Sequence, residues 1–381
     1  MTETTQSNAT EFDVAVIGAG LAGSCAAILL AQGGASVVLL DASTPGHHKV
    51  CGEFLSPESR TQLAQLGVME ALGQLGVQSV SVARVSTSTR QGRPINLPGE
   101  GIAISRATLD ALLWRRAHEL GVQTRDQHRV SAIERAPDGS FVLQTNQSSL
   151  SAHLVISAAG RSSRWGRDAD ANSTPKPGER FVGIKTHMRG AHIGRGEVVL
   201  FPFEGGYCGL VEIEDEQFNV CLLAPYARLK NKAPRDLWEE LRRENRALGE
   251  ATEGAHQLFD WIATANVSFD RFAPIHDGIL RIGDAAGYIH PLSGDGMAMA
   301  LRSGELAARS LQDALKWHLC PNEAARNYAR MWQREFGHRL KWASALHPLL
   351  TNVRLSNAVL RLVDALPLLS HVAAIHTRGK Q

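Results

Sequence analysis

The sequence lacks the long apolar stretches that membrane proteins and secreted precursors carry. Its 381 residues contain no apolar run of about 18, whereas a helix that spans a bilayer needs roughly 20 such residues. The first eleven residues, MTETTQSNATE, are polar and hold no apolar core of a signal peptide. We therefore expect a cytoplasmic protein.

Cysteine is sparse and follows no recognisable pattern. No CxxC motif and no His/Cys spacing typical of a metal site occurs. The five cysteines are Cys25, Cys51, Cys208, Cys221 and Cys320. An odd number of widely spread cysteines predicts neither a disulfide framework nor a metal centre.

An excess of one charge is also missing. The formal net charge is +2, which is too small to indicate a nucleic-acid partner. The sequence has no P-loop, no HExxH and no Ser-His-Asp order, so phosphoryl transfer and hydrolysis have no basis. A hydrophobic content of 44% in a chain of this length predicts one large α/β domain with a smaller inserted unit.

What the sequence does contain begins with a βαβ pattern. Residues 12–17, FDVAVI, read as a buried parallel strand, and a second strand at 36–40 ends in Asp41. Between them lie three glycines at GxGxxG spacing, followed by a helical pattern: Gly18, Gly20 and Gly23. Such a turn lets a pyrophosphate approach the start of a helix, and the carboxylate accepts ribose hydroxyls and repels a 2′-phosphate. The ligand is therefore FAD or NAD rather than NADP.

A second glycine-bearing segment chooses between these two ligands. Residues 279–282 read as a strand that delivers a Gly-Asp pair, and HPLSGDGMAMALRSGELAA follows with a helix that starts near Gly296. Proline fixes a turn here, and the glycines admit a flat ring beside a helix N-terminus, which stabilises a reduced flavin. The residues assigned to this end of FAD are Gly283, Asp284, Pro291, Gly294 and Gly296.

Four segments together resemble the FAD-dependent oxidoreductases built on the p-hydroxybenzoate hydroxylase fold. They are GAGLAG with Asp41, ISRATLDALLWRRAHELG, VISAAGRSSRWGR and GDAAGYIHPLSGDGMAMALRSGELAA. That superfamily includes aromatic hydroxylases, geranylgeranyl reductases and flavin-dependent halogenases, and the last segment is nearest to the geranylgeranyl reductases. The resemblance implies that Arg106 lies against the pyrophosphate and that Met297 presents its backbone to the flavin ring.

The sequence differs from the families that it resembles at three places. Residues 158–164 lack the Asp-Gly pair of many hydroxylases, so NAD(P)H as electron donor acts directly or through a separate reductase. The Trp-x-Trp-x-Ile-Pro motif of tryptophan halogenases is absent. Where geranylgeranyl reductases show Tyr-x-Trp-x-Phe-Pro, this chain keeps Tyr207 but has Gly209 at the position of the tryptophan.

These patterns predict an α/β fold with a Rossmann-like FAD-binding domain, an inserted antiparallel sheet and a helical C-terminus. We expect a discontinuous FAD-binding domain at 10–175 and 270–330. The substrate-binding sheet domain is expected at 176–269, with part of 80–105, and the C-terminal helices at 331–381. An apolar final helix makes membrane contact an alternative to burial.

Four residues are candidates for chemistry. The resemblance places the loop HHKVCGEFLSPES near the flavin, where Cys51 donates a proton or positions substrate beside cationic Lys49; the alternative is a small packed residue. Glu53 is a second candidate acid or base. His290 bonds the flavin or takes a proton, or else satisfies a backbone carbonyl. Tyr207 points into the pocket or packs in the sheet. A helix is expected to begin at Ser56-Pro57, with the serine as N-cap.

Three functions follow from this reading. The first is a monooxygenase that hydroxylates an aromatic or hydrophobic small molecule, using molecular oxygen and a flavin C4a-hydroperoxide protected in a closed pocket. The second is a geranylgeranyl reductase-like ene-reductase with Cys51 near the acceptor carbon. The third is a non-catalytic FAD-binding protein. The first is the favoured expectation.

Overall fold

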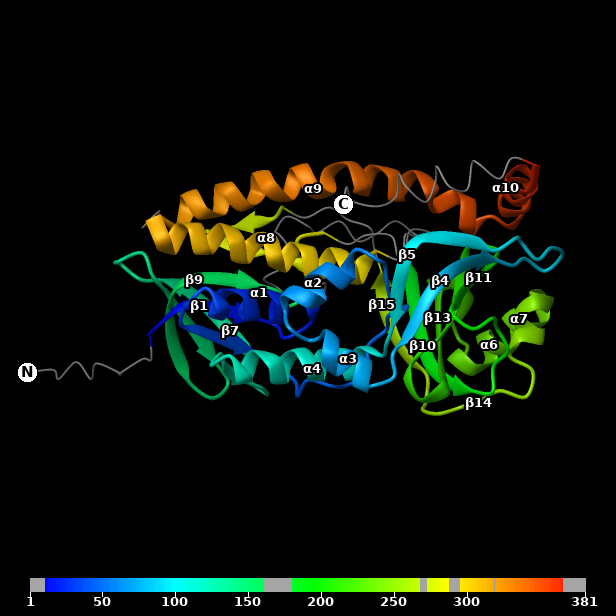
Figure 1. Cartoon of the computed structure of the whole chain (residues 1–381), viewed down its shortest axis with the longest axis horizontal. Helices are drawn as coiled ribbons and strands as arrows, with labels where there is room; N and C mark the ends of the chain where they lie inside the picture. The colour runs from blue at the N-terminus through cyan, green and yellow to red at the C-terminus, as the bar shows by residue number, and fades with distance from the viewer. Residues whose placement is uncertain (1–10, 161–179, 268–272, 288–294, 318–319, 366–381) are drawn as a thin grey trace, which may run out of the picture.

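The computed structural model describes residues 11–160, 180–267, 273–287, 295–317 and 320–365. They form two multistranded sheets that lie side by side and are bridged by long helices (Figure 1). The predicted α/β class, with a Rossmann-like unit and a second sheet, is confirmed.

The first sheet is mainly parallel and has the strand order β16-β17-β9-β1-β2-β6. Its parallel strands are β1 (Glu11–Ile17), β2 (Val37–Leu40), β6 (Gln123–Arg125), β9 (Ser149–Ser157) and β17 (Ile279–Arg281). Antiparallel strands extend it: β7 (Val130–Arg135), β8 (Phe141–Thr145) and β16 (Ile275–His276). β1 lies in the middle of this sheet, where its residues from Val14 to Ile17 are buried on both faces, as is typical of a central parallel strand. The three strands predicted at 12–17, 36–40 and 279–282 are confirmed.

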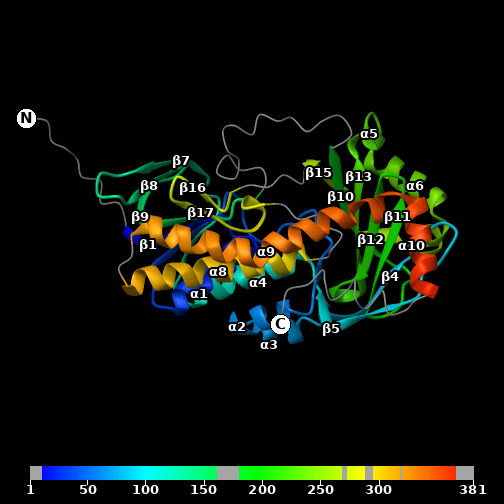
Figure 2. The ribbon, with the colours of Figure 1, turned by 90° about the horizontal axis from the view of Figure 1, so that it is seen from above.

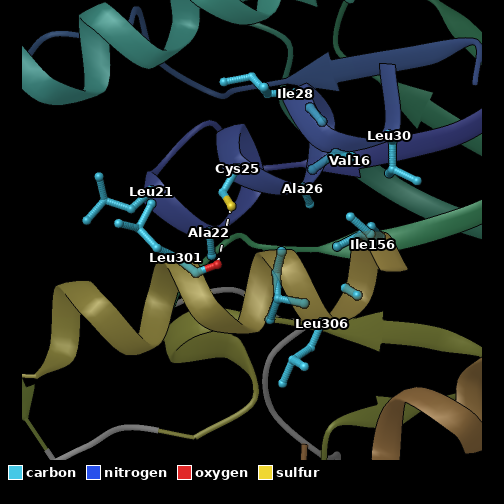
Figure 3. Packing of buried hydrophobic residues seen from close by; sticks show 14 of the residues in the cluster. Val16, Leu21, Ala22, Cys25, Ala26, Ile28, Leu30, Ile156, Leu301 and Leu306 are labelled. Atoms are coloured by element: carbon cyan, nitrogen blue, oxygen red, sulfur yellow. Dashed lines mark hydrogen bonds between the residues drawn. The ribbon is translucent and has the colours of Figure 1, made fainter. Parts of the chain in front are cut away.

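Helices α1 (Leu21–Gln32) and α8 (Gly296–Trp317) pack against each other on this sheet. A Cβ on Gly304 of α8 would lie 2.4 Å from the carbonyl oxygen of Ala22, so only glycine permits this approach. The Cys25 thiol donates to the carbonyl oxygen of Leu301 at 3.3 Å across the same interface (Figure 3). The two helices that follow the glycine-bearing segments are thereby locked together.

The second sheet is mainly antiparallel, with the order β14-β10-β13-β12-β11-β4-β5-β3 and with β15 paired to β10. Its strands are β3 (Phe54–Leu55), β4 (Gln78–Val85), β5 (Ile95–Ala103), β10 (Phe181–Arg189), β11 (Glu197–Phe203), β12 (Gly206–Glu212), β13 (Gln217–Pro225), β14 (His256–Gln257) and β15 (Ile262–Val267). We call it the substrate sheet. In sequence, β3, β4 and β5 of this sheet precede β6 of the first sheet, whereas its other strands follow β6. The domain boundaries given in the sequence analysis stay a prediction.

One face of the substrate sheet is covered by α6 (Pro234–Glu244) and α7 (Arg246–Ala251), with α5 (Tyr226–Leu229) at its edge. The sequence pattern over 233–248 is that of one amphipathic helix, but the structure divides it at Asn245. The backbone of Asn245 is extended because its side chain caps α7 by accepting from the Leu248 N–H, and its amide donates to the Ser86 and Pro202 carbonyls. A buried polar side chain therefore divides the helix.

Three more helices and two 3-10 turns connect other elements of the fold. They are α2 (Ser59–Gln65), α3 (Met69–Gln74), α4 (Arg106–Glu119) and the 3-10 turns Glu214–Glu216 and Gly283–Ala285. The helix expected to start at Ser56-Pro57 begins at Ser59, with Glu58 as N-cap. Ser56 instead accepts the Ser59 N–H through its backbone carbonyl, and its hydroxyl has no partner within the described part of the chain. The predicted cap is therefore wrong.

Two helices follow α8: α9 (Pro321–Thr351) and α10 (Val353–Ala365). Figure 2 shows α9 running beside α8 and reaching the substrate sheet, where α10 lies. The predicted boundary at 330/331 falls inside α9. Among the helices that the structure describes, none joins enough length to enough apolar character to cross a bilayer.

Candidate functional site

A cavity of about 1040 Å³ lies between the two sheets. It is lined by both glycine-bearing segments, although more than 250 residues separate them in sequence. Eight of the residues predicted to bind the cofactor meet there: Gly18, Gly20, Asp41, Arg106, Gly283, Asp284, Gly296 and Met297. The predicted His290, Pro291 and Gly294 lie outside the described residues. The convergence of the two segments on one cavity is the geometry that a dinucleotide with a flavin at its far end requires.

In the turn after β1, each of the three glycines is required for a different structural reason. Gly18 has φ +101°, and a Cβ there would lie 2.4 Å from the Ala158 carbonyl oxygen. A Cβ on Gly23 would lie 1.9 Å from the Gly18 carbonyl oxygen. Gly20 is different, because its Cβ would meet only the Arg106 guanidinium at 3.6 Å. Two glycines thus shape the backbone, while Gly20 leaves open space in front of the α1 N-terminus, which carries no side-chain cap.

Asp41 closes this end of the cavity. One carboxylate oxygen accepts the Ala19 N–H at 2.7 Å, and the other accepts the N–H and the hydroxyl of Ser43, both at 2.9 Å. A carboxylate has about four lone-pair positions, so a ribose hydroxyl still finds an acceptor. The residue ties the glycine turn to the end of β2 and fits an adenosine ribose. Its contact with the cofactor stays a prediction.

Arg106 belongs to a charge network that sequence reasoning missed. It opens α4, and its guanidinium holds Asp110 with two hydrogen bonds of 2.9 Å, while the Lys49 ammonium reaches the same carboxylate at 2.8 Å. Burial would raise the pKa of Asp110, but these two cations outweigh it and hold the pKa below its ordinary value. The unit keeps one positive charge in excess beside Gly20, where a pyrophosphate would lie. The i,i+4 spacing of Arg106 and Asp110 on a helix was the available signal.

The second glycine-bearing segment rests on α1. Gly283 has φ +58°, its Cβ would lie 3.0 Å from the Ala22 Cβ, and its N–H donates to the Ser303 hydroxyl at 2.8 Å. Gly296 opens α8, and no atom of the described residues lies within 4 Å of the position of its Cβ. The exposed start of a long helix therefore faces the cavity, with Asp284 half-buried nearby.

The opposite wall of the cavity is the apolar face of the substrate sheet. Its side chains come from alternate positions of four neighbouring strands: Ala83, Val198, Leu200, Tyr207, Val211 and Leu223. Tyr207 is buried and packs with Phe181 and Leu223. Gly209 lies in the same wall and leaves it recessed. This wall suits an apolar ligand, and the catalytic role of Tyr207 stays a prediction.

Cys51 lies where the two parts of the cavity meet. It is half-buried and lines the cavity, its thiol accepts the Glu53 N–H at 3.5 Å, and its carbonyl accepts from the Asn219 amide at 3.1 Å. The Arg106 guanidinium interacts with its sulfur, which helps to raise the pKa of the arginine. Its proposed role in chemistry stays a prediction, but its place between the glycine turns and the apolar wall meets the geometric requirement.

His48 is a cavity residue that sequence reasoning did not select. Its imidazole stacks on Phe259 with the ring centroids 4.1 Å apart and stands edge-on to His187 at 5.0 Å. Burial, followed by the charges of His187 and Lys185, lowers the pKa of His48. A neutral imidazole therefore faces the cavity at neutral pH.

The comparisons with known proteins now identify the family. The sequence model of the FAD binding domain matches residues 11–318. The chain belongs to the FAD binding domain family. With the reductases named below, this makes it an FAD-dependent oxidoreductase, and the likeness to the p-hydroxybenzoate hydroxylase superfamily is confirmed.

Two curated relatives span most of the chain. Digeranylgeranylglycerophospholipid reductase 2 of Methanopyrus kandleri is 28% identical over 352 residues, which cover 87% of this chain and 85% of the relative. Menaquinone reductase of Mycolicibacterium smegmatis is 26% identical over 328 residues, or 78% of this chain and 76% of that protein. Both relatives are named as reductases.

Among solved structures, halogenase PltM in complex with phloroglucinol and FAD superimposes with a TM-score of 0.76 at 18% identity. The alignment covers 96% of this chain and 85% of PltM. Flavin-dependent brominase Bmp2 gives a TM-score of 0.73 at 17% identity over 93% of both chains. These likenesses establish the fold.

Proposed function

We propose that this FAD-dependent oxidoreductase reduces a carbon–carbon double bond in an apolar, isoprenoid-like substrate. The observation that carries the proposal is the composition of the cavity. It runs from the glycine turns to an apolar wall, and Cys51 stands at the junction. A substrate held on the apolar wall would present its double bond between the flavin end and this thiol.

The reaction needs a hydride for one carbon and a proton for the other. Bound FAD, once reduced, is the hydride source. The chain supplies the proton: the Cys51 thiol gives it to the second carbon, and the negative charge left on sulfur faces the Arg106 guanidinium. The sulfur then regains a proton from water, so that the substrate gains two hydrogens and the cofactor is oxidised. NAD(P)H, acting directly or through a separate reductase, would reduce the cofactor again.

Hydroxylation is the second candidate, and the apolar wall supports it because an oxygenating flavoprotein needs a pocket that excludes water. We place reduction first for two reasons. The two curated relatives described above, which cover most of the chain, are named as reductases, and hydroxylation has no use for a thiol at the junction.

The two candidates differ in the mass of the product. Anaerobic incubation of the protein with dithionite or NAD(P)H and a geranylgeranyl lipid is expected to add two hydrogens, about 2 Da per double bond. Hydroxylation instead requires air and adds one oxygen, about 16 Da. Mass spectrometry of the extracted lipid decides between them. If the lipid gains no 2 Da under anaerobic conditions but gains about 16 Da in air, the proposal is overturned.

Gly209 offers a prediction about substrate size. By the resemblance, geranylgeranyl reductases carry tryptophan at this position, whereas the wall is recessed here. A Cβ on Gly209 would make only ordinary contacts, at 3.5 Å to Leu200 and 3.7 Å to the Cys221 carbonyl oxygen, so a side chain fits the backbone and fills the cavity. We expect Gly209→Trp to raise KM for a twenty-carbon substrate about tenfold, roughly the 1–3 kcal/mol of a few lost methylene contacts. KM for a five- or ten-carbon analogue should change little. Equal effects on both substrates would contradict this assignment.

A further inference from the structure

The cavity-facing side of the substrate sheet is mainly apolar but carries one fully buried polar patch. Lys185 and His187 on β10 and Asn219 on β13 are 0–1% exposed, and His187 pairs with Asn219 across the two strands. Lysine and histidine are rarely buried so completely unless they are paired. Three polar side chains in this position therefore need partners, and those partners show what the patch does.

All of these partners lie in the short segment that carries Cys51. The Lys185 ammonium contacts one Glu53 carboxylate oxygen and donates to the Lys49 carbonyl at 3.1 Å. His187 donates to the other Glu53 oxygen at 2.7 Å, and the Asn219 amide donates to the Cys51 carbonyl at 3.1 Å. The segment 49–53 is thus fixed to the substrate sheet before, at and after Cys51.

Glu53 also links this patch to the cofactor end of the cavity. Its carboxylate accepts the Arg106 N–H at 2.6 Å, which satisfies one of the unpaired donors at the start of α4. Its backbone has φ +53°, a conformation that residues other than glycine seldom adopt. One side chain therefore joins the substrate sheet, the Cys51 segment and the helix whose arginine borders Gly20.

The charge state of Glu53 argues against a role as acid. Burial would raise the pKa of its carboxyl, but the hydrogen bond from His187 and the charge of Lys185 outweigh burial and hold the pKa below its ordinary value. The carboxylate stays ionised at neutral pH, its side chain is fully buried, and both of its oxygens are occupied. The expectation of a general acid at Glu53 does not fit this geometry.

We propose that Glu53, Lys185 and His187 are positioning residues that hold Cys51 in line between the flavin and the substrate. The proposal rests on the proposed function, since it assigns the three residues an effect on turnover that acts through the Cys51 thiol. It differs from a purely structural role because that effect must vanish when the thiol is absent.

The test uses the full-length holoprotein with the double substitution Glu53→Gln/Lys185→Met. Both buried charges are removed together at similar volume, a change that buried ion pairs often tolerate. The matched control is Glu197→Gln/Arg84→Met, which removes an ion pair of 2.5 Å in the same sheet. We expect the first variant to keep its FAD and to lose 10- to 100-fold in kcat with KM changed less than threefold, while the control keeps its kcat.

The same pair of substitutions placed in Cys51→Ala protein should cause no further loss of kcat, because residues that act through one group are not additive. An equal loss with and without the thiol would overturn the proposal. So would a variant whose kcat matches wild type.

A second measurement does not depend on turnover. Alkylation by iodoacetamide, followed by peptide mass spectrometry, should label Cys51 at least fivefold faster in Glu53→Gln/Lys185→Met, with exposed Cys320 as the internal reference. An unchanged labelling rate shows that the three residues do not hold Cys51, even if double-bond reduction is established. Faster labelling in a protein that reduces no double bond would instead support the positioning and refute the proposed function.

Discussion

Purified Gly20→Val protein is expected to be colourless. Gly20 stands in front of the α1 N-terminus, where the space around it is open except for the Arg106 guanidinium at 3.6 Å. A valine side chain would enter the volume that a pyrophosphate needs and would leave the protein's own backbone unstrained. We expect affinity for FAD to fall at least 100-fold, roughly 3 kcal/mol. The measurement is the flavin absorbance of the purified protein and a titration of the apoprotein with FAD.

Gly73→Val is the matched control. Gly73 is exposed in α3, is not part of the cavity lining, and has no described atom within 4 Å of the position of its Cβ. This variant should be as yellow as wild type, and the two apoproteins should melt within a few degrees of each other. Asp41→Ala should also lose FAD, but its apoprotein should be less stable because Asp41 holds Ala19 and Ser43. Full occupancy in both Gly20→Val and Asp41→Ala would refute the cofactor site.

The cofactor end of the cavity could be predicted from the sequence because its constraints are local. Gly18 has φ +101°, and a Cβ on Gly23 would lie 1.9 Å from the Gly18 carbonyl oxygen. Only glycine fits at either position. The order of strand, glycine turn, helix, strand and carboxylate then limits the fold. Convergence of the two segments also followed, since the carboxyl ends of parallel strands meet at one edge of a sheet.

The polar patch of Lys185, His187 and Asn219 could not be predicted, because its contacts join residues that are far apart in the sequence. Glu53 meets Lys185 and His187 across separations of 132 and 134 residues. In sequence these two residues stand in an ordinary strand pattern, FVGIKTHMR, and nothing in that pattern indicates that they pair with Glu53. The break at Asn245 escaped notice for the same reason, since Ser86 and Pro202 accept its amide hydrogens.

The local sequence at Ser56 predicted the start of the helix incorrectly. Ser-Pro before a helical pattern is a common cap, yet the helix begins three residues later. The residues just before Ser56, Phe54 and Leu55, form β3, which pairs with β5 of the substrate sheet. The pairing of β3 with β5 fixes the position of Leu55, so the chain leaves the substrate sheet at Ser56 and α2 begins only at Ser59.

Replacing Cys51 by alanine is expected to abolish most turnover while FAD stays bound. Removal of a positioned proton donor commonly costs about 10²- to 10⁴-fold in rate, and we expect about 10³-fold in kcat for double-bond reduction. The Cys51 carbonyl accepts a hydrogen bond from the Asn219 amide. Alanine retains this carbonyl, so the segment should keep its place. Stopped-flow reduction of the flavin by the electron donor should be unchanged, because that step precedes the use of the thiol.

The control for this substitution is Cys208→Ala, the same change on the opposite face of the substrate sheet. Cys208 is fully buried in the cluster beneath α6 and lies outside the cavity lining. Its loss should lower the melting temperature and leave kcat within threefold of wild type. If both variants keep kcat, the proton comes from another group and the catalytic role of Cys51 is wrong. A loss of kcat confined to Cys51→Ala, with normal flavin reduction, places the missing step at substrate protonation, which hydroxylation does not contain.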